Sequence, residues 1–176
     1  ARVIFPNIGE IWPQFAAPEE ASFVSLALML LPHGLIGFVV AAAFIAAAQT
    51  GDLATLRRLL EAGTPIDARD GRGRTALLAG THADQVEAAR LLIERGADVN
   101  AKDDMQDSPF LYAGAQGRLE ILRMTLAAGA DLKSTNRYGG TALIPAAHHG
   151  HVETVRELLK TAIDIDHVNR LGWTAL

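Results

Sequence analysis

The sequence predicts an all-α solenoid of stacked helix-turn-helix repeats, each of 33 residues, preceded by an apolar helix. The first observation is a spacing: Thr75, Ser108, Thr141 and Thr174 lie 33 residues apart, and each opens the same short motif. The second is that every complete copy is followed by an apolar stretch at helical spacing and then by a variant of Gly-Ala-Asp-Val-Asn. A fixed period of this length is typical of stacked-repeat proteins, which bind partners and rarely catalyse reactions.

The first complete repeat, residues 70–102, shows the elements that this pattern predicts. Residues 70–74 form a turn, in which glycines supply positive φ and the first aspartate accepts a backbone N–H. Thr75 caps a first helix that ends near residue 84, and a second helix covers about residues 85–95. Gly96 then ends the second helix in the left-handed conformation.

The same elements recur in residues 103–135 and 136–168, while residues 42–69 and 169–176 are partial repeats. Residues 42–176 therefore form the predicted repeat domain. In the second helices, one set of apolar residues at helical spacing is expected to face the core. This set comprises Val86, Ala89, Leu92, Ile93, Leu119, Leu122, Leu126, Val152, Val155, Leu158 and Leu159.

Composition excludes several classes of function. The 176 residues carry 16 Lys and Arg against 20 Asp and Glu, and a net charge of -4 has the wrong sign for neutralising nucleic-acid phosphates. The chain has no cysteine, which excludes disulfides and thiolate metal sites. Neither a nucleophile motif nor a phosphate-binding glycine loop is present, so we expect no catalytic residue, no cofactor and no enzyme.

Three motifs carry a family resemblance. They are Asp70-x-x-Gly73-x-Thr75, Gly96-Ala97-Asp98-Val99-Asn100 and Gly150-His151-Val152-Glu153. On these motifs and the period, residues 42–176 resemble an ankyrin-repeat protein, and the run from Thr141 to His151 is similar to the bacterial members. The resemblance implies an ankyrin-repeat solenoid that serves as a protein–protein interaction scaffold.

Some positions depart from the family pattern. The histidine that usually follows Thr-Pro-Leu is replaced by Leu78, Leu111 and Ile144. Asp84 stands where a glycine usually ends the first helix, and Ala162 replaces the glycine that ends a second helix. Because an alanine at positive φ costs about 1 kcal/mol, we expect the loop at Ala162 to be deformed.

Residues 1–41 do not follow the repeat. From Ala21 to Gly51 the sequence has no Lys, Arg, Asp or Glu, which is a longer stretch than a membrane span needs, although Pro32-His33-Gly34 interrupts it. A secretory signal peptide fits poorly, since glutamates precede the apolar run where basic residues are expected. Two interpretations stay open: a membrane helix through residues 21–48, and a cap in which Phe44 and Ile45 cover the first repeat.

A second resemblance covers residues 1–43. Arg2-Val3-Ile4-Phe5-Pro6, Pro18-Glu19-Glu20-Ala21 and the run from Leu31 to Gly37 resemble a loop and helix of a sodium:solute symporter. In that family a pair of hydroxyl residues after this helix helps to hold sodium, and here Gln49 and Thr50 supply at best half of the pair. The alternative function is therefore a fragment of a sodium-coupled solute transporter, fused or misjoined to the repeats.

Partner-binding residues are expected on the concave face, which the turn tips and first helices form. The candidates occupy the non-consensus positions of these elements, where Tyr, Trp and Arg dominate binding hot spots. They are Arg72, Arg74, Met105, Asp107, Tyr112, Gln116, Arg137, Tyr138, His148, His149 and Trp173. We expect an unknown protein as the partner, no nucleic acid, and a monomeric repeat domain.

Some of these residues have a second interpretation. Tyr112 and Tyr138 could equally pack between repeats, and the arginines and aspartates of the first two turns give a mixed surface without a charge preference. His148, His149 and His151 are close enough in sequence to bind a metal, but we expect a structural or solvated role and no metal. The start without methionine and the stop within a repeat motif indicate a fragment, and the compartment stays open between bacterial cytoplasm and periplasm.

Overall fold

The computed structural model describes residues 33–176, and every regular element in this range is a helix. The chain divides into two compact units, Ala1–Val39 and Val40–Leu176. The described part of the first unit is the beginning of helix α3 (His33–Thr50), and the rest of this helix belongs to the second unit. The predicted boundary after residue 41 therefore falls inside a continuous helix.

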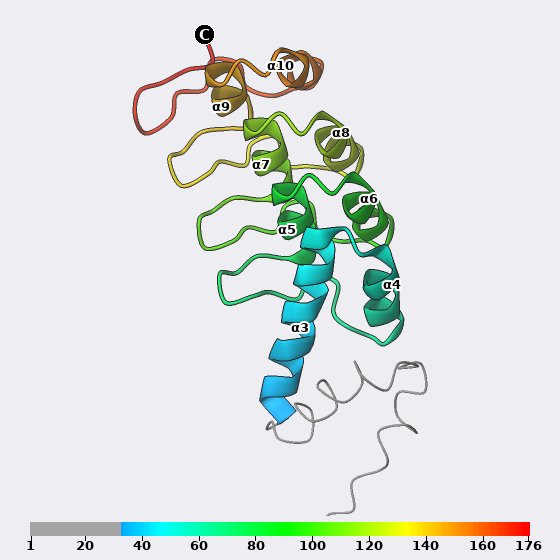
Figure 1. The fold of residues 1–176 in the computed structure, drawn as a ribbon. Coiled ribbons are helices and arrows are strands. Elements are labelled where there is room, and N and C mark those ends of the chain that lie inside the picture. The colour runs from blue at the N-terminus through cyan, green and yellow to red at the C-terminus, as the bar shows by residue number, and fades with distance from the viewer. Residues whose placement is uncertain (1–32) are drawn as a thin grey trace, which may run out of the picture. The chain divides into compact units, whose positions relative to one another are not determined.

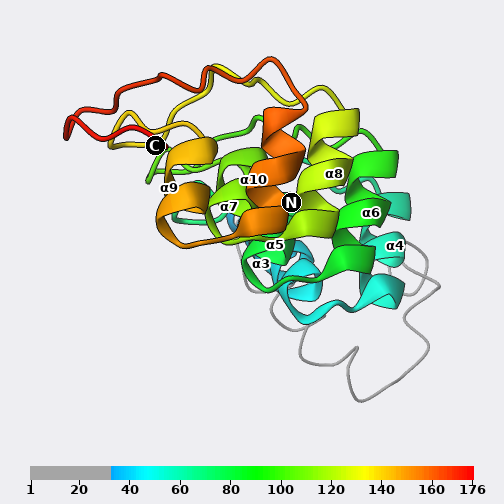
Figure 2. The same ribbon diagram turned by 90° about the horizontal axis from the view of Figure 1, so that it is seen from above.

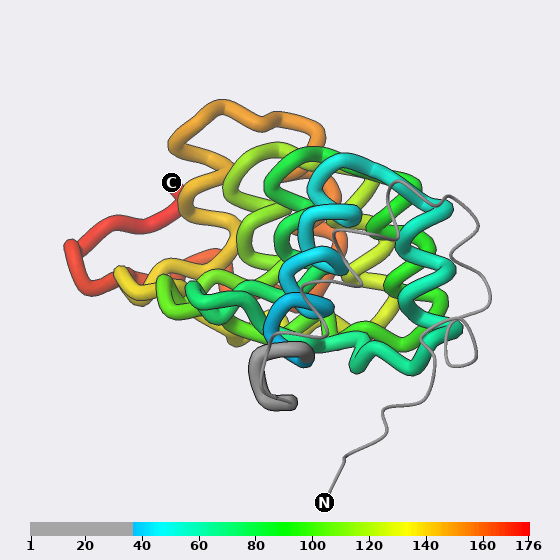
Figure 3. The backbone as a smooth tube through the Cα atoms, turned by 60° about the horizontal axis from the view of Figure 1, so that its bottom comes forward, coloured from blue at the N-terminus to red at the C-terminus, as the bar shows by residue number. Residues whose placement is uncertain are grey.

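Within residues 40–176 the helices form two rows. The second row consists of α4 (Leu53–Glu61), α6 (Val86–Glu94), α8 (Leu119–Ala127) and α10 (Val152–Leu159). The first row consists of the end of α3, α5 (Ala76–His82), α7 (Pro109–Ala115) and α9 (Leu143–His148). Figures 1 and 2 show the two rows side by side, and Figure 3 shows the backbone following the same path in successive repeats. The predicted all-α solenoid of helix-turn-helix repeats is confirmed.

The first helices begin at the predicted hydroxyl residues in two of three repeats. The Oγ1 of Thr75 accepts a hydrogen bond from Leu78 N at 3.3 Å, and the Oγ of Ser108 accepts one from Leu111 N at 3.2 Å. Thr141 does not cap α9, and its buried hydroxyl has no partner among the described residues. In the first complete repeat, the predicted helix ends lie within two residues of the observed ones. Helix α3 begins at His33, well before the predicted start of the repeats at residue 42.

One apolar core fills the space between the two rows. Its most buried members include Phe44, Leu92, Phe110, Leu122 and Leu158, each with 0 % of its surface exposed. These side chains come from successive repeats, so each repeat buries its apolar face mainly against its neighbours, as in other repeat proteins.

Two residues of the predicted core set are exposed. Val152 and Leu159 of α10 are 58 % and 53 % exposed, although we expected both to face the core. The equivalent residues of α6 and α8 are partly buried because the next second helix of the row packs on them. No second helix follows α10 in this sequence, so the prediction was wrong for these two positions.

Three of the four second helices are followed by a glycine in the left-handed conformation, as predicted. Gly63, Gly96 and Gly129 have φ values of 86°, 87° and 87°, whereas Ala162 is not among the described residues with positive φ. Helix α10 ends earlier, and Ile163 N donates to the Oγ1 of Thr161 at 3.2 Å instead of to the helix backbone. The predicted deformation of this loop is confirmed, since alanine avoids the left-handed region.

The last turns of α3 pack on the first repeat. Phe44 is fully buried and Ile45 is 3 % exposed, as the cap interpretation predicts. Within residues 33–176, none of the helices combines the length and the apolar character that crossing a membrane requires. Residues 1–32, which contain the start of the proposed membrane segment and most of the symporter resemblance, lie outside the described residues.

Gln106 allows a test of the turn geometry. It has a φ of 63°, whereas the equivalent residues of the other hairpins are glycines. We expect Gln106→Gly to raise the free energy of unfolding by roughly 0.5–1 kcal/mol, because relief of left-handed strain exceeds the entropy cost of a glycine. Urea denaturation measures this change. Asp104→Gly, in the same turn but without positive φ, is the control and should give no gain.

Candidate binding face

Four equivalent hairpin turns project from the repeats. In the first, the Oδ1 of Asp70 accepts hydrogen bonds from Arg72 N and Arg74 N, both at 2.9 Å. Asp103, Asn136 and Asn169 make the same pair of bonds in the following turns. The side chain that opens each turn thus holds the tip residue outward. The exposed tip residues are Arg72, Met105, Tyr138 and Leu171.

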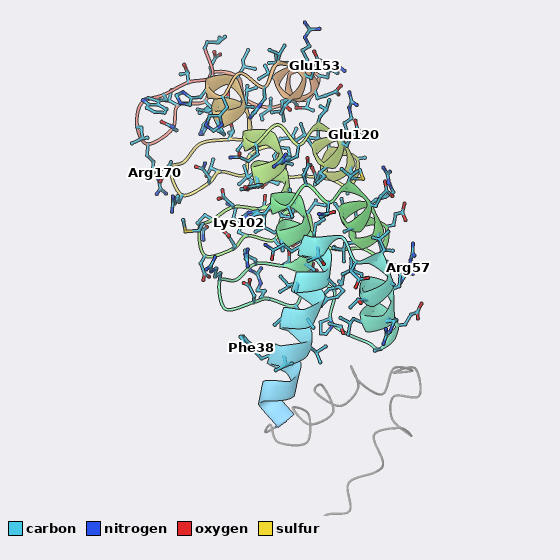
Figure 4. The ribbon with its side chains drawn as sticks, viewed as in Figure 1. Phe38, Arg57, Lys102, Glu120, Glu153 and Arg170 are labelled. Carbon is cyan, nitrogen blue, oxygen red and sulfur yellow. The ribbon has the colours of Figure 1, made fainter. Side chains whose placement is uncertain are left out.

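Hydrogen bonds between neighbouring hairpins hold the tips in register. Lys102 Nζ donates to Thr135 O at 2.7 Å, and Arg69 makes the equivalent bond to Lys102 O one repeat earlier. Arg170 N donates to Tyr138 O at 2.9 Å. Figure 4 shows Lys102 and Arg170 on the hairpin side, and Arg57, Glu120 and Glu153 on the side of the second helices. We use the name binding face for the surface formed by the hairpins and by α5, α7 and α9.

The two candidate arginines of the first hairpin differ in their surroundings. Arg74 Nη2 lies 2.8 Å from the Oδ2 of Asp70, so its charge is paired inside its own turn. Burial raises the pKa of Asp70, but the N–H groups of Arg74 and Arg72 and the Arg74 guanidinium outweigh it and leave the pKa below its usual value. Arg72 remains exposed at its tip. Of the two predicted arginines here, only Arg72 has a charge that the turn leaves available.

Tyr112 packs between two repeats. Its ring stacks on His82 of the preceding first helix, with 3.7 Å between the ring centroids and 21° between the planes. Burial, and next the positive charge of Arg74, lower the pKa of His82. The imidazole is therefore neutral at pH 7 and forms a flat partner for the tyrosine. Gln116 is exposed at the end of α7.

Met105, Arg137 and Tyr138 lie together at the tips of neighbouring hairpins. The guanidinium carbon of Arg137 lies 4.7 Å from the centre of the Tyr138 ring, in a cation–π contact. Its Nη1 lies 3.2 Å from the Sδ of Met105. Tyr138 is 48 % exposed, so the structure leaves it accessible beside the arginine.

A pocket of about 420 Å³ lies between the last two hairpins and α9. The ring of His148 stacks on Trp173 with 5.4 Å between centroids, and His149 Nδ1 lies 3.0 Å from Ala115 O. The pocket brings together four of the predicted residues: Tyr138, His148, His149 and Trp173. Its other lining residues are Asn136, Gly140, Ile144, Pro145, Asn169 and Leu171.

The histidine group has contacts of its own. The rings of His148, His149 and His151 meet edge to face, at centroid distances of 5.4 Å and 5.8 Å. The His151 ring lies against Gly117 of the preceding repeat. Across residues 33–176, no group of three or more His, Cys, Asp or Glu side chains is placed to hold a metal ion.

Leu171 and His82 are among the residues of the binding face that were not predicted. Leu171 lines the pocket, and it lies 33 residues after Tyr138, so the repeat spacing that placed Arg72, Met105 and Tyr138 also placed it. His82 contacts Tyr112, but nothing in the local sequence indicates this stacking, because the two residues belong to different repeats.

Paired helices in two rows, with hairpins on one side, define the class of helical-repeat proteins. Family models for ankyrin repeats match residues 44–93 (many copies) and residues 110–176 (three copies). The chain belongs to the ankyrin-repeat family.

Two solved structures agree with this assignment. An ankyrin repeat domain from Acinetobacter baumannii AYE is 62 % identical, with a TM-score of 0.73 over 75 % of this chain and 67 % of that one. The ankyrin repeat protein EF0377 is 43 % identical, with a TM-score of 0.72 over 77 % of this chain and 69 % of that one. Among curated proteins, no match was found.

Asp107 provides a prediction for pH dependence. Burial and the nearby Asp103 carboxylate raise its pKa above the usual 3.8. The folded protein therefore holds this proton more tightly than the unfolded chain, and stability falls as the pH rises from 3.8 through the raised pKa. At pH 7, Asp107→Asn should raise the free energy of unfolding by about 0.2–1 kcal/mol, the usual size of part-exposed charge effects.

Urea denaturation of both proteins across the pH range tests this prediction. The gain should be constant at neutral pH and should disappear below pH 3.8, where Asp107 is protonated in both states. A gain that is the same at every pH would show that the substitution acts through packing and not through charge.

Proposed function

We propose that this chain binds a partner protein through its binding face and acts as an interaction scaffold without catalysis. Ankyrin repeats generally mediate protein–protein interaction, and the hydrogen-bonded hairpins provide a rigid row of exposed side chains. The observation that carries the proposal is the pocket between the last two hairpins and α9, where four predicted residues meet.

The residue types of this pocket support a protein partner. Tyr138 and Trp173 are 48 % and 50 % exposed, and both are large, rigid side chains that lose little entropy on binding. The imidazoles of His148 and His149 and the apolar Leu171 complete a surface that suits a side chain of a partner.

A capture experiment tests the proposal. The repeat protein is immobilised, partners are captured from a lysate of the source cells, and the comparison is made with Tyr138→Ala plus Trp173→Ala. Since truncation of hot-spot residues costs about 2 kcal/mol or more, the variant should lose roughly 30-fold or more in partner affinity. The matched control is Val152→Ala plus Leu159→Ala, which removes apolar groups of similar exposure from α10.

The two variants separate the outcomes. If Tyr138→Ala plus Trp173→Ala (the hairpin variant) loses the partner and the α10 control keeps it, binding through this face is supported. Equal capture by the hairpin variant and the wild type would place the interaction elsewhere on the chain. Far-UV circular dichroism confirms that both variants remain folded.

A further inference from the structure

The pocket between the last two hairpins has no acidic side chain in its lining. All ten lining residues are aromatic, apolar, amide, glycine or histidine. Arg137 and Arg170 directly precede Tyr138 and Leu171, so a cation stands beside each of the two tip residues that line the pocket. The pocket therefore has a cation beside each of these two tips and no acidic residue in its lining.

The two arginines make no ion pair within residues 33–176. Arg137 contacts the sulfur of Met105 and the ring of Tyr138. Arg170 Nη1 donates to Arg137 O at 3.1 Å. The positive charge of Arg137 partly offsets the rise in the pKa of Asp107, but no ion pair joins these two residues within residues 33–176. Both arginines keep donors that can bind a carboxylate from outside.

Three other arginines of the repeats pair with carboxylates of the chain. Arg74, Arg118 and Arg123 each lie 2.8–2.9 Å from a carboxylate of the chain itself. The second hairpin carries one acidic candidate, Asp107, beside the arginines of the first, so the surface of these two hairpins is mixed. Arg72 at the first tip also makes no ion pair within residues 33–176, but it adjoins the mixed surface of the second hairpin, since Asp104 N donates to Arg72 O at 3.2 Å. The pocket at the last two hairpins combines two such arginines with a lining that has no acidic side chain.

On the basis of the proposed function, we propose that this pocket binds an acidic segment of the partner, which inserts one aromatic or branched aliphatic side chain. A volume of about 420 Å³ accommodates such a side chain, and Tyr138, Trp173 and Leu171 supply its contacts. Carboxylates on either side of the inserted residue pair with Arg137 and Arg170. Complementary charge at the rim then selects acidic over basic segments.

Fluorescence anisotropy with three labelled peptides tests the proposal on the full chain. In the first peptide a central phenylalanine is flanked by glutamates, in the second the same phenylalanine is flanked by lysines, and in the third a central alanine is flanked by glutamates. The first should bind more tightly than both others. Its affinity should fall with added salt, since exposed charge pairs are screened.

Arg137→Gln plus Arg170→Gln should weaken binding of the first peptide roughly 2- to 30-fold, as expected for two exposed charge pairs. Arg57→Gln plus Arg95→Gln changes the net charge equally on exposed residues of the second-helix row, and it should leave the affinity unchanged. Far-UV circular dichroism confirms the fold of both variants.

The proposal of an acidic segment would be overturned if the lysine peptide bound as tightly as the first peptide or more tightly. It would also be overturned if the Arg137 and Arg170 variant and the Arg57 and Arg95 variant lost the same affinity for the first peptide. Absence of binding by all three peptides would also overturn it. The capture experiment is independent of these peptides. Loss of partner capture with the Tyr138 and Trp173 variant, together with failure of the peptides, would leave the proposed function standing and reject only the acidic partner.

Discussion

Phe110→Ala is expected to lower the free energy of unfolding by about 3–5 kcal/mol, the usual cost of emptying a fully buried aromatic site. Phe110 is 0 % exposed and lies in the first turn of α7, in the middle of the stack. Its backbone N–H donates to Val99 O at 3.4 Å, which ties α7 to the preceding repeat. Because repeats are stabilised by their neighbours, a cavity here weakens two interfaces at once.

Urea denaturation followed by far-UV circular dichroism measures this loss. The control is Phe38→Ala, which removes the same side chain from a position that is 53 % exposed, and it should change stability by less than about 0.5 kcal/mol. Figure 4 labels Phe38 on α3. If Phe110→Ala lost no more than this control, the tight packing between α7 and its neighbours would be refuted.

Gly114→Ala is expected to lower the free energy of unfolding by about 1–3 kcal/mol, although alanine is the better helix former. A Cβ at this position would lie 2.7 Å from the Cβ of Ala142 and 3.3 Å from its carbonyl oxygen. Both atoms belong to a rigid segment at the start of α9, so no flexible side chain can turn away. The close approach of α7 and α9 therefore requires a glycine.

Gly37→Ala is the matched control for Gly114. Gly37 is also helical and without positive φ, but a Cβ there would meet nothing within 4 Å. The control should be neutral or stabilising, since only helix propensity changes. Thermal unfolding of both variants compares them. A gain in stability with Gly114→Ala would mean that α9 moves away from α7 at little cost.

Much of the fold follows from local signals. Thr75 and Ser108 cap their helices because a hydroxyl before an apolar run can bond an early helical N–H whatever surrounds it. Gly96 and Gly129 end theirs because only glycine enters the left-handed region without cost. The deformed loop at Ala162 follows from the same rule.

Other features depended on neighbours that the local sequence does not show. Val86 and Val152 occupy equivalent positions, yet Val152 is exposed because no second helix packs on α10. Arg74 and Arg137 are both hairpin arginines, but only Arg74 has a carboxylate partner in the fold. The prediction of a mixed charge surface therefore describes the first two hairpins and not the pocket.

By itself, the sequence determined the 33-residue repeat, the helical class, the ends of most helices and the face on which candidate residues lie. Capping, positive φ and helical periodicity act within a few residues, so they can be read along the chain. The tertiary structure alone decided which candidates meet. Tyr138, His148 and Trp173 form one pocket because their hairpins and α9 are stacked, and Tyr112 packs on His82 for the same reason.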